Sequence, residues 1–136
     1  MKPVCLVVGA GAGIGGTVGK RFAEEGYHSV LCRRSDEGGL NRLVANIKEG
    51  GGEASGFLLN AVEENSIEER VAQIELEIGP IEVVVFNLGA QVGNRKLEET
   101  TYKVFELGWR MATVSYTHLR AHETRHDLVC RLLLEK

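Results

Sequence analysis

Long apolar runs, paired cysteines and a strong charge of either sign are all missing from this 136-residue sequence. No run approaches the ~20 apolar residues that cross a bilayer. The formal net charge is only −3, so nothing indicates a nucleic-acid or membrane partner. The three cysteines have no paired spacing, which favours free thiols in a reducing compartment. No apolar leader with a small-residue cleavage site precedes the first predicted strand. We therefore expect a cytoplasmic protein.

Glycine, in contrast, is plentiful, and five glycines stand close together near the N-terminus, at positions 9, 11, 13, 15 and 16. Before them, the apolar and β-branched run VCLVV at residues 4–8 predicts a buried strand of a parallel sheet. After them, the spacing of Val18, Phe22 and Ala23 predicts a helix. Strand, glycine turn and helix together favour a dinucleotide site, because the turn lets the backbone approach the pyrophosphate and the first helical amides face it. A purely structural turn is the alternative.

Strands and helices alternate along the rest of the chain. Further strands are predicted at residues 28–32, 54–59 and 81–86, and helices at 40–49, 66–78 and from about 100 onward. Ser66 and Glu69 fit a capping box at the start of one helix. Right-handed crossovers make this an α/β fold, a Rossmann-type doubly wound parallel sheet with strand order 3-2-1-4, truncated after the fourth strand and the following helix. Cys5 and Cys32 would lie on neighbouring strands as buried thiols.

Two arginines directly follow the second predicted strand, where a dinucleotide fold holds the adenosine ribose. An acid there favours NAD, because it accepts hydrogen bonds from the ribose hydroxyls, whereas arginine pairs with the extra phosphate of NADP. Arg33 and Arg34 stand at this place, and the first acid is Asp36. We therefore expect NADP, with NAD as the second choice. Solvated loop charges are the alternative interpretation.

These motifs resemble those of the short-chain dehydrogenase/reductase family over residues 1–113. The matches to its T-G-x-x-x-G-I-G motif are Gly9, Gly13, Ile14 and Gly15, with Val8 in place of the threonine. Residues 87–90, Asn-Leu-Gly-Ala, resemble the family's N-N-A-G turn. Asn60 stands where the family usually carries an Asp that meets the adenine. With the glycine turn and the arginines, the expected cofactor-binding residues are Gly9, Gly11, Gly13, Ile14, Gly15, Arg33, Arg34, Asn60, Ala61, Asn87, Gly89 and Ala90.

The resemblance implies an NADP-preferring oxidoreductase that transfers a hydride between NADP(H) and a small-molecule carbonyl or alcohol substrate, and a parent protein that forms homo-oligomers. The family's catalytic Ser and Tyr-x-x-x-Lys pair are absent here, and the nearest imitation ends in Arg120. The family's helical Asn would fall near Ala112. No catalytic residue is therefore expected, and the chain as it stands should be inactive. A non-catalytic NADP-binding regulatory module is the alternative.

The last part of the chain, residues 114–136, differs in composition. His122 and His126 form an H-E-x-x-H pattern, which can bind zinc when it lies on a helix. Residues 114–124 and 127–136, however, resemble a translated sequencing adapter codon by codon, and a sample index would supply residues 125 and 126. We therefore predict the N-terminal part of a dinucleotide-binding Rossmann domain at 1–113 and a non-native, adapter-derived tail at 114–136. No metal site is predicted, and a zinc hydrolase is the minor alternative. Without further strands, the apolar edge of the fourth strand predicts poor solubility.

Overall fold

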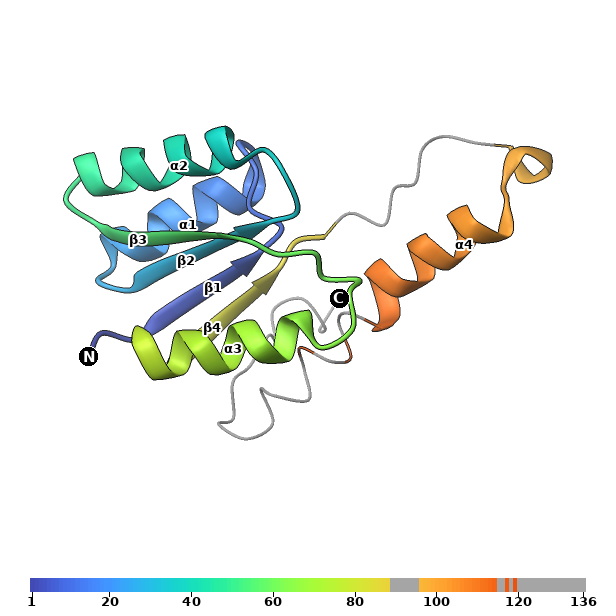
Figure 1. The fold of residues 1–136 in the computed structure, drawn as a ribbon. Helices are drawn as coiled ribbons and strands as arrows, with labels where there is room; N and C mark the ends of the chain where they lie inside the picture. The colour runs from blue at the N-terminus through green and yellow to red at the C-terminus, as the bar shows by residue number, and fades with distance from the viewer. Residues whose placement is uncertain (89–95, 115–116, 118, 120–136) are drawn as a thin grey trace.

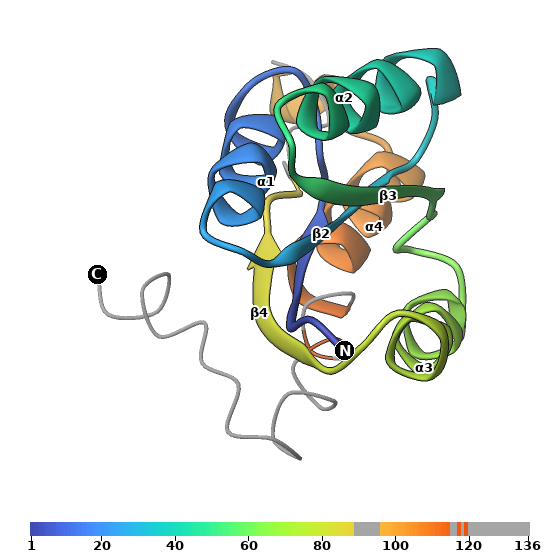
Figure 2. The same ribbon diagram turned by 90° about the vertical axis from the view of Figure 1, so that its left-hand side faces the viewer.

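The computed structural model describes residues 1–88 and 96–114, together with Thr117 and Leu119. Its centre is a parallel four-stranded sheet in the order β3-β2-β1-β4, with α1 and α2 on one face and α3 on the other (Figures 1 and 2). The elements are β1 Val4–Val8, α1 Ile14–Glu24, β2 His28–Arg33, α2 Glu37–Glu49, β3 Glu53–Leu58, α3 Ser66–Glu77, β4 Ile81–Phe86, the 3-10 turn η1 Leu97–Glu99, α4 Tyr102–Trp109 and the π-helix η2 Arg110–Val114. The doubly wound α/β fold and the strand order predicted above are confirmed.

The core lies on both faces of the sheet because successive side chains of a strand point to opposite sides. On one face, Val7 and Leu31 pack with Leu40 and Ile47 of α2. On the other face lies a second cluster that includes residues of α3 and Leu119. Every residue of β1 is buried, as its continuous apolar run predicted.

Helix α1 packs closely against the sheet through small residues. Its buried residues are Gly15, Gly16, Gly19 and Ala23, while Val18 and Phe22 are only half-buried. A Cβ atom at Gly19 would lie 2.5 Å from the Leu31 Cδ2 atom. Ala23 and Phe22 do contact the core cluster of this face, while the glycines at the contact let the backbone of the helix itself pack against the strand.

The predicted capping box at the start of α3 was wrong. The N-cap of α3 is Asn65, in the left-handed conformation with φ +62°. The Ser66 hydroxyl donates to the carbonyl oxygens of Asn60, at 2.7 Å, and Glu63, at 3.0 Å. Ser66 therefore closes the turn after β3 instead of accepting a hydrogen bond from a helical amide. Thr101 caps α4, since its Oγ1 accepts from the Val104 amide at 3.2 Å, and the helix begins close to the predicted position.

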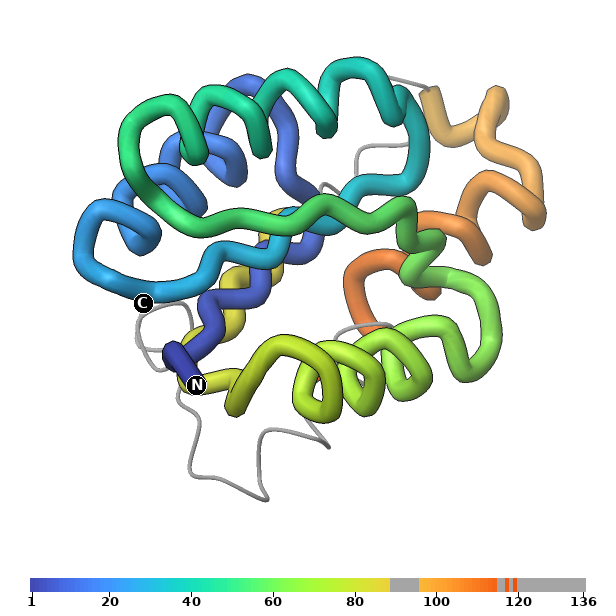
Figure 3. Tube along the Cα trace, turned by 60° about the vertical axis from the view of Figure 1, so that its left-hand side comes forward, coloured from blue at the N-terminus to red at the C-terminus, as the bar shows by residue number. Residues whose placement is uncertain are grey.

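Helix α4 lies at the opposite end of the molecule from the N-terminus (Figure 3). It continues directly into η2. None of the helices in the described residues is long and apolar enough to cross a membrane. In the described sheet, β4 is an edge strand, and its Val83, Val85 and Phe86 are half-buried.

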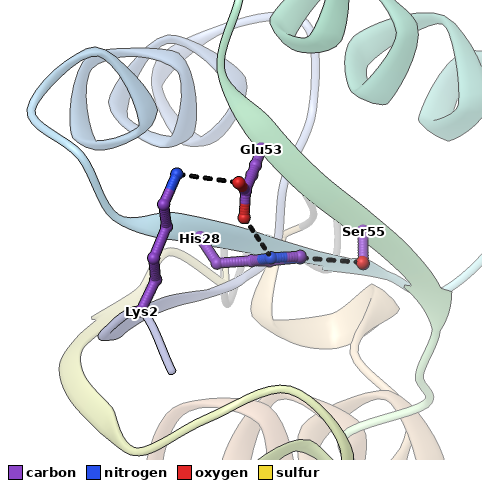
Figure 4. A network of polar contacts seen from close by, with 4 residues as sticks. All are labelled: Lys2, His28, Glu53 and Ser55. Atoms are coloured by element: carbon purple, nitrogen blue, oxygen red, sulfur yellow. Dashed lines mark hydrogen bonds and ion pairs between the residues drawn. The ribbon is translucent and has the colours of Figure 1, made fainter.

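A polar network joins the amino ends of β2 and β3 with the segment before β1 (Figure 4). The Lys2 Nζ atom donates to Glu53 Oε1 at 2.7 Å, and Glu53 Oε2 lies 3.5 Å from His28 Nδ1. On its other side, His28 Nε2 lies 2.8 Å from Ser55 Oγ. Burial lowers the pKa of His28, although the Glu53 carboxylate opposes this. The hydrogen bond from Lys2 is the main cause that lowers the pKa of Glu53.

Candidate functional site

The carboxyl ends of β1 and β4 are held together by backbone contacts around Gly9. Gly9 has φ +94°, and a Cβ atom there would lie 2.5 Å from the Asn87 carbonyl oxygen. The Asn87 amide donates to the Val8 carbonyl at 2.8 Å, and its side-chain Nδ2 donates to the Gly9 carbonyl at 3.3 Å. The amides of Gly9 and Ala10 donate to the Cys32 carbonyl of β2. Only glycine fits at position 9, because both the conformation and the space exclude a side chain.

Helix α1 starts directly behind this turn with its N-terminus facing the carboxyl edge of the sheet. A Cβ atom at Gly15 would lie 2.5 Å from the Gly9 carbonyl oxygen, so Gly15 is what allows the helix to come this close. At Gly11 and Gly13, a Cβ atom would meet none of the described atoms within 4 Å. The first turn carries no acidic residue and no side-chain cap. The Gly16 amide donates to the Gly11 carbonyl at 2.9 Å. The amides before it, at Ile14 and Gly15, have no intrahelical acceptor, so this end of α1 suits an anion.

Ile14 is the one large side chain of this turn. It is 71% exposed although it is apolar. Its exposure and its place at the first residue of α1 put an apolar surface beside the backbone amides at the start of the helix. A ligand with both a phosphate and an apolar ring would fit such a surface.

The two arginines after the second strand have different surroundings. Arg33 Nη1 lies 3.4 Å from Asp36 Oδ2, and Asp36 Oδ1 accepts from the Gly39 amide at 2.9 Å to cap α2. Asp36 takes the left-handed conformation with φ +60°. Arg34 is exposed and lines a cavity of about 160 Å³. The structure therefore brings Arg34 to a cavity and gives Arg33 a carboxylate partner.

Residues from the ends of several helices and strands line this cavity. Its lining is Arg34, Leu59, Asn60, Ala61, Val62, Leu88, Leu107 and Met111. Arg34, Asn60 and Ala61 were predicted as site residues. The apolar residues Leu107 of α4 and Met111 of η2 were not, because their i, i+4 spacing indicates only one apolar helical face and does not distinguish a cavity from a core.

Asn60 faces the cavity through a turn that its own side chain stabilises. Its Oδ1 accepts from the Val62 amide, and its Nδ2 donates to Glu63 Oε1, both at 3.3 Å. Ala61 is buried beneath it. The side-chain amide of Asn60 thus holds the turn that lines the cavity.

The remaining predicted positions lie outside the described residues. These are Gly89 and Ala90 of the turn after β4, and His122 and His126 of the H-E-x-x-H pattern. Within the described part of the chain, no group of three His, Cys, Asp or Glu side chains could hold a metal ion. Cys5 and Cys32 are buried thiols outside any disulfide, as predicted, and burial raises the pKa of Cys32 to about 12.

Known proteins resemble this chain in sequence and in fold. A family model described as short chain dehydrogenase matches residues 3–125. A short-chain dehydrogenase from Rhodopseudomonas palustris is 33% identical with a TM-score of 0.83, over 90% of this chain and 57% of that one. A blue fluorescent protein from a metagenomic library, solved in complex with NADPH, is 21% identical with a TM-score of 0.82, over 91% of this chain and 51% of that one.

Among curated proteins, the fatty acyl-CoA reductase of Acinetobacter baylyi is 34% identical over 89 residues, which is 65% of this chain and 30% of the relative. The chain spans about a third of the length of the curated relatives that it matches. The family match runs past Thr113 to residue 125, so the boundary placed after Thr113 stays a prediction.

Proposed function

This chain belongs to the short-chain dehydrogenase family, and on that premise we propose that its parent protein transfers a hydride between NADP(H) and a small-molecule carbonyl or alcohol substrate. The observation that carries the proposal is the turn at Gly9, which Asn87 and Gly15 hold against the N-terminus of α1. Arg34 and its cavity supply a place for the adenosine end of the cofactor. The NADPH bound to the structurally similar metagenomic protein supports this choice of cofactor.

In this proposal each described group has a binding task. The amides at the start of α1 bind the pyrophosphate, and the glycines of the turn let it approach the backbone. Arg34 pairs with the 2′-phosphate, while Leu107 and Met111 cover the adenine. The nicotinamide, when bound, supplies the hydride chemistry. Because the chain contains no Tyr-x-x-x-Lys pair, we expect it to bind the cofactor without turnover.

The binding test compares two glycine-to-alanine variants. Gly15→Ala places a Cβ atom 2.5 Å from the Gly9 carbonyl oxygen, which would push α1 away from the turn, so NADP⁺ affinity should fall by about tenfold or more. Gly50→Ala is the matched control, since a Cβ atom there meets nothing closer than 3.4 Å. Isothermal titration of the 136-residue chain with NADP⁺ gives both affinities. A wild-type chain that binds neither NADP⁺ nor NAD⁺ would refute the proposal.

We also propose that the parent forms homo-oligomers in the cytoplasm. The exposed aromatic side chains of α4, Tyr102, Phe105 and Trp109, support an oligomer, because large exposed apolar patches commonly mark protein interfaces. Sedimentation velocity of the full-length protein and its Phe105→Ser variant tests this. A wild-type monomer at micromolar concentration would contradict it.

For residues 114–136 we propose the adapter origin. Amplification from source nucleic acid and resequencing downstream of the codons for Trp109, Arg110 and Met111 tests it. A frame that continues into a Ser and a Tyr-x-x-x-Lys pair is the expected result and decides for the enzyme over a regulatory module. A frame that again encodes His-Glu-Thr-Arg-His would contradict the adapter origin and would call for metal analysis of the purified protein.

A further inference from the structure

A serine, a histidine and a glutamate lie next to one another at the amino ends of β2 and β3 (Figure 4). His28 stands opposite Glu53 in the parallel register. Glu53 and Ser55 are two residues apart, so their side chains share one face of β3. The His28 ring lies between them, with Nε2 at 2.8 Å from Ser55 Oγ and Nδ1 at 3.5 Å from Glu53 Oε2. A hydroxyl, an imidazole that can take its proton and a carboxylate that orients the imidazole are the parts of an activated serine nucleophile.

The Glu53 carboxylate determines which nitrogen of His28 carries the proton. An ionised carboxylate only accepts hydrogen bonds, so it favours the tautomer with the proton on Nδ1. Nε2 is then the acceptor, and the Ser55 hydroxyl donates to it. Lys2 keeps Glu53 ionised, because its Nζ donates to Oε1 at 2.7 Å and this hydrogen bond is the main cause that lowers the pKa of Glu53. The Ser55 hydroxyl is thus bonded to a nitrogen that can accept its proton.

His28 is in its basic form near neutral pH. Its side chain is only 18% exposed, and burial is the largest cause that lowers its pKa. The Glu53 carboxylate on β3 opposes this shift, whereas the charges of Lys48 on α2 and of Lys2 before β1 add to it. Since a neutral imidazole can act as a general base, His28 can activate Ser55 without a change of pH.

The backbone beside Ser55 supplies a donor for a carbonyl oxygen. The Leu59 amide donates to the Arg33 carbonyl of β2. Because backbone groups alternate between the two sides of a strand, the Gly56 amide points away from β2. Within the described part of the chain, β3 pairs only with β2, so this amide lies at the open edge of the sheet. An amide directly after the nucleophile can stabilise the negative charge that develops on the carbonyl oxygen.

We propose that Ser55 is a nucleophilic site that takes an acyl group from small activated esters, with His28 as its general base and Glu53 as the residue that positions His28. Ser55 Oγ forms a bond to the ester carbonyl carbon, and its proton passes to His28 Nε2. The bond from that carbon to the leaving oxygen breaks, and the leaving alcohol takes the proton from His28. Water then attacks the same carbon with His28 as base, which releases the acid and free Ser55.

Short acyl groups are the class that suits this site, since Ser55 and Gly56 are both half-buried. The site lies at the amino ends of the strands, whereas the proposed cofactor site lies at the carboxyl ends. The inference therefore does not depend on NADP binding, and Ser55→Ala should bind NADP⁺ as tightly as wild type.

The experiment follows acetylation of the 136-residue chain by p-nitrophenyl acetate. Release of p-nitrophenolate gives the rate, and mass spectrometry of the tryptic peptide 49–70 locates the acetyl group. This peptide also contains Ser66, whose hydroxyl donates to two backbone carbonyl oxygens. The acetyl group should be on Ser55 and not on Ser66. The comparison of two serines in one peptide needs no variant, so it does not depend on the folding of any variant.

Four variants test the role of each residue. Ser55→Ala should abolish acetylation of the peptide, and His28→Gln should slow it by about 100-fold, the usual contribution of a general base. In wild type the rate should rise with pH to a plateau near neutrality. Glu53→Gln removes a charge that raises the pKa of His28, so this rise should shift to lower pH. Glu49→Gln, which removes an exposed charge of the same peptide, is the matched control and should change neither rate nor pH dependence.

A wild-type chain that is not acetylated at Ser55, or that is acetylated equally at Ser66, would overturn the inference. A His28→Gln variant that keeps the wild-type rate or its pH dependence would overturn it as well. An unshifted pH profile in Glu53→Gln would contradict the positioning role of Glu53.

Discussion

The two ends of the parallel sheet differ in the kind of contacts that their polar groups make. At the amino ends, Lys2, Glu53, His28 and Ser55 satisfy one another through side-chain contacts. At the carboxyl ends, the contacts are mostly backbone ones around Gly9, and the start of α1 and the Arg34 charge face outward. The end that pairs its own polar groups stabilises the fold, and the end that leaves donors available can bind a ligand. Ligands of open α/β sheets bind in the crevice outside the carboxyl ends of the strands.

The largest effect on stability should come from Gly9→Val, which disrupts the turn at the carboxyl end of the sheet. A β-branched residue at φ +94°, with its Cβ atom 2.5 Å from the Asn87 carbonyl oxygen, should lower the free energy of unfolding by about 3 kcal/mol or more. Urea denaturation followed by circular dichroism measures the loss. Gly50→Ala, the control, should change it by less than about 1 kcal/mol. Equal stability of the two variants would mean that the Gly9 turn does not hold the sheet ends together.

Asn87→Ala should lower the free energy of unfolding by less, because it removes only one side-chain contact at the same end of the sheet. The variant loses the hydrogen bond from Asn87 Nδ2 to the Gly9 carbonyl, worth about 1 kcal/mol, and keeps the backbone bond to Val8. The same denaturation measurement applies, and NADP⁺ affinity should fall with it. Asn46→Ala, an exposed position of α2, should lower neither quantity.

The stability that the polar network at the amino end of the sheet contributes should depend on pH. Because burial lowers the folded-state pKa of His28 below its ordinary 6.5, the unfolded chain binds a proton more readily than the folded one. The contribution of neutral His28 to the free energy of unfolding is thus complete above pH 6.5 and is lost as the pH falls from there through the folded-state pKa. Glu53, whose pKa is also lowered, adds a further loss below its ordinary value of 4.5.

Thermal unfolding of wild type and His28→Gln between pH 5 and 8 measures the first of these losses. The dependence around pH 6 should be shallower in the variant, since glutamine does not titrate. Parallel pH profiles would show that His28 is not the responsible group.

The smallest effect should come from Lys2→Gln. Both partners of the Lys2–Glu53 pair are about half exposed, and exposed pairs contribute little because water screens them. The variant should unfold within about 1 °C of wild type at neutral pH, and 0.5 M NaCl should remove what difference remains. A loss of stability as large as that in Asn87→Ala would show that the Lys2–Glu53 pair contributes more than an exposed ion pair.

Much of the fold follows from local patterns. The bounds predicted for the first and fourth strands match β1 and β4, and β2 and β3 differ by one residue. The start of α2 was missed because its cap, Asp36, precedes two glycines that carry no apolar periodicity. Around the candidate site, Gly9, Gly15 and Asn87 were predicted from the family motifs and Arg34 from its place after the second strand, and as cofactor contacts they stay predictions. Leu107 and Met111 were not predicted, since an apolar helical face does not reveal whether a core or a cavity lies beneath it.

The sequence alone determined where strands, helices and the glycine turn lie, because backbone preference and apolar periodicity are properties of neighbouring residues. The tertiary structure alone decided which residues meet across long separations. The pairing of β2 with β3 brings His28 opposite Glu53 and beside Ser55. The close packing of α1 on β2 required Gly19. Arg33, the last residue of β2, lies beside Asp36, and Arg34, the first residue after the strand, borders the cavity. These two adjacent residues have different surroundings because the chain folds differently around each of them, which no local pattern in the sequence could show.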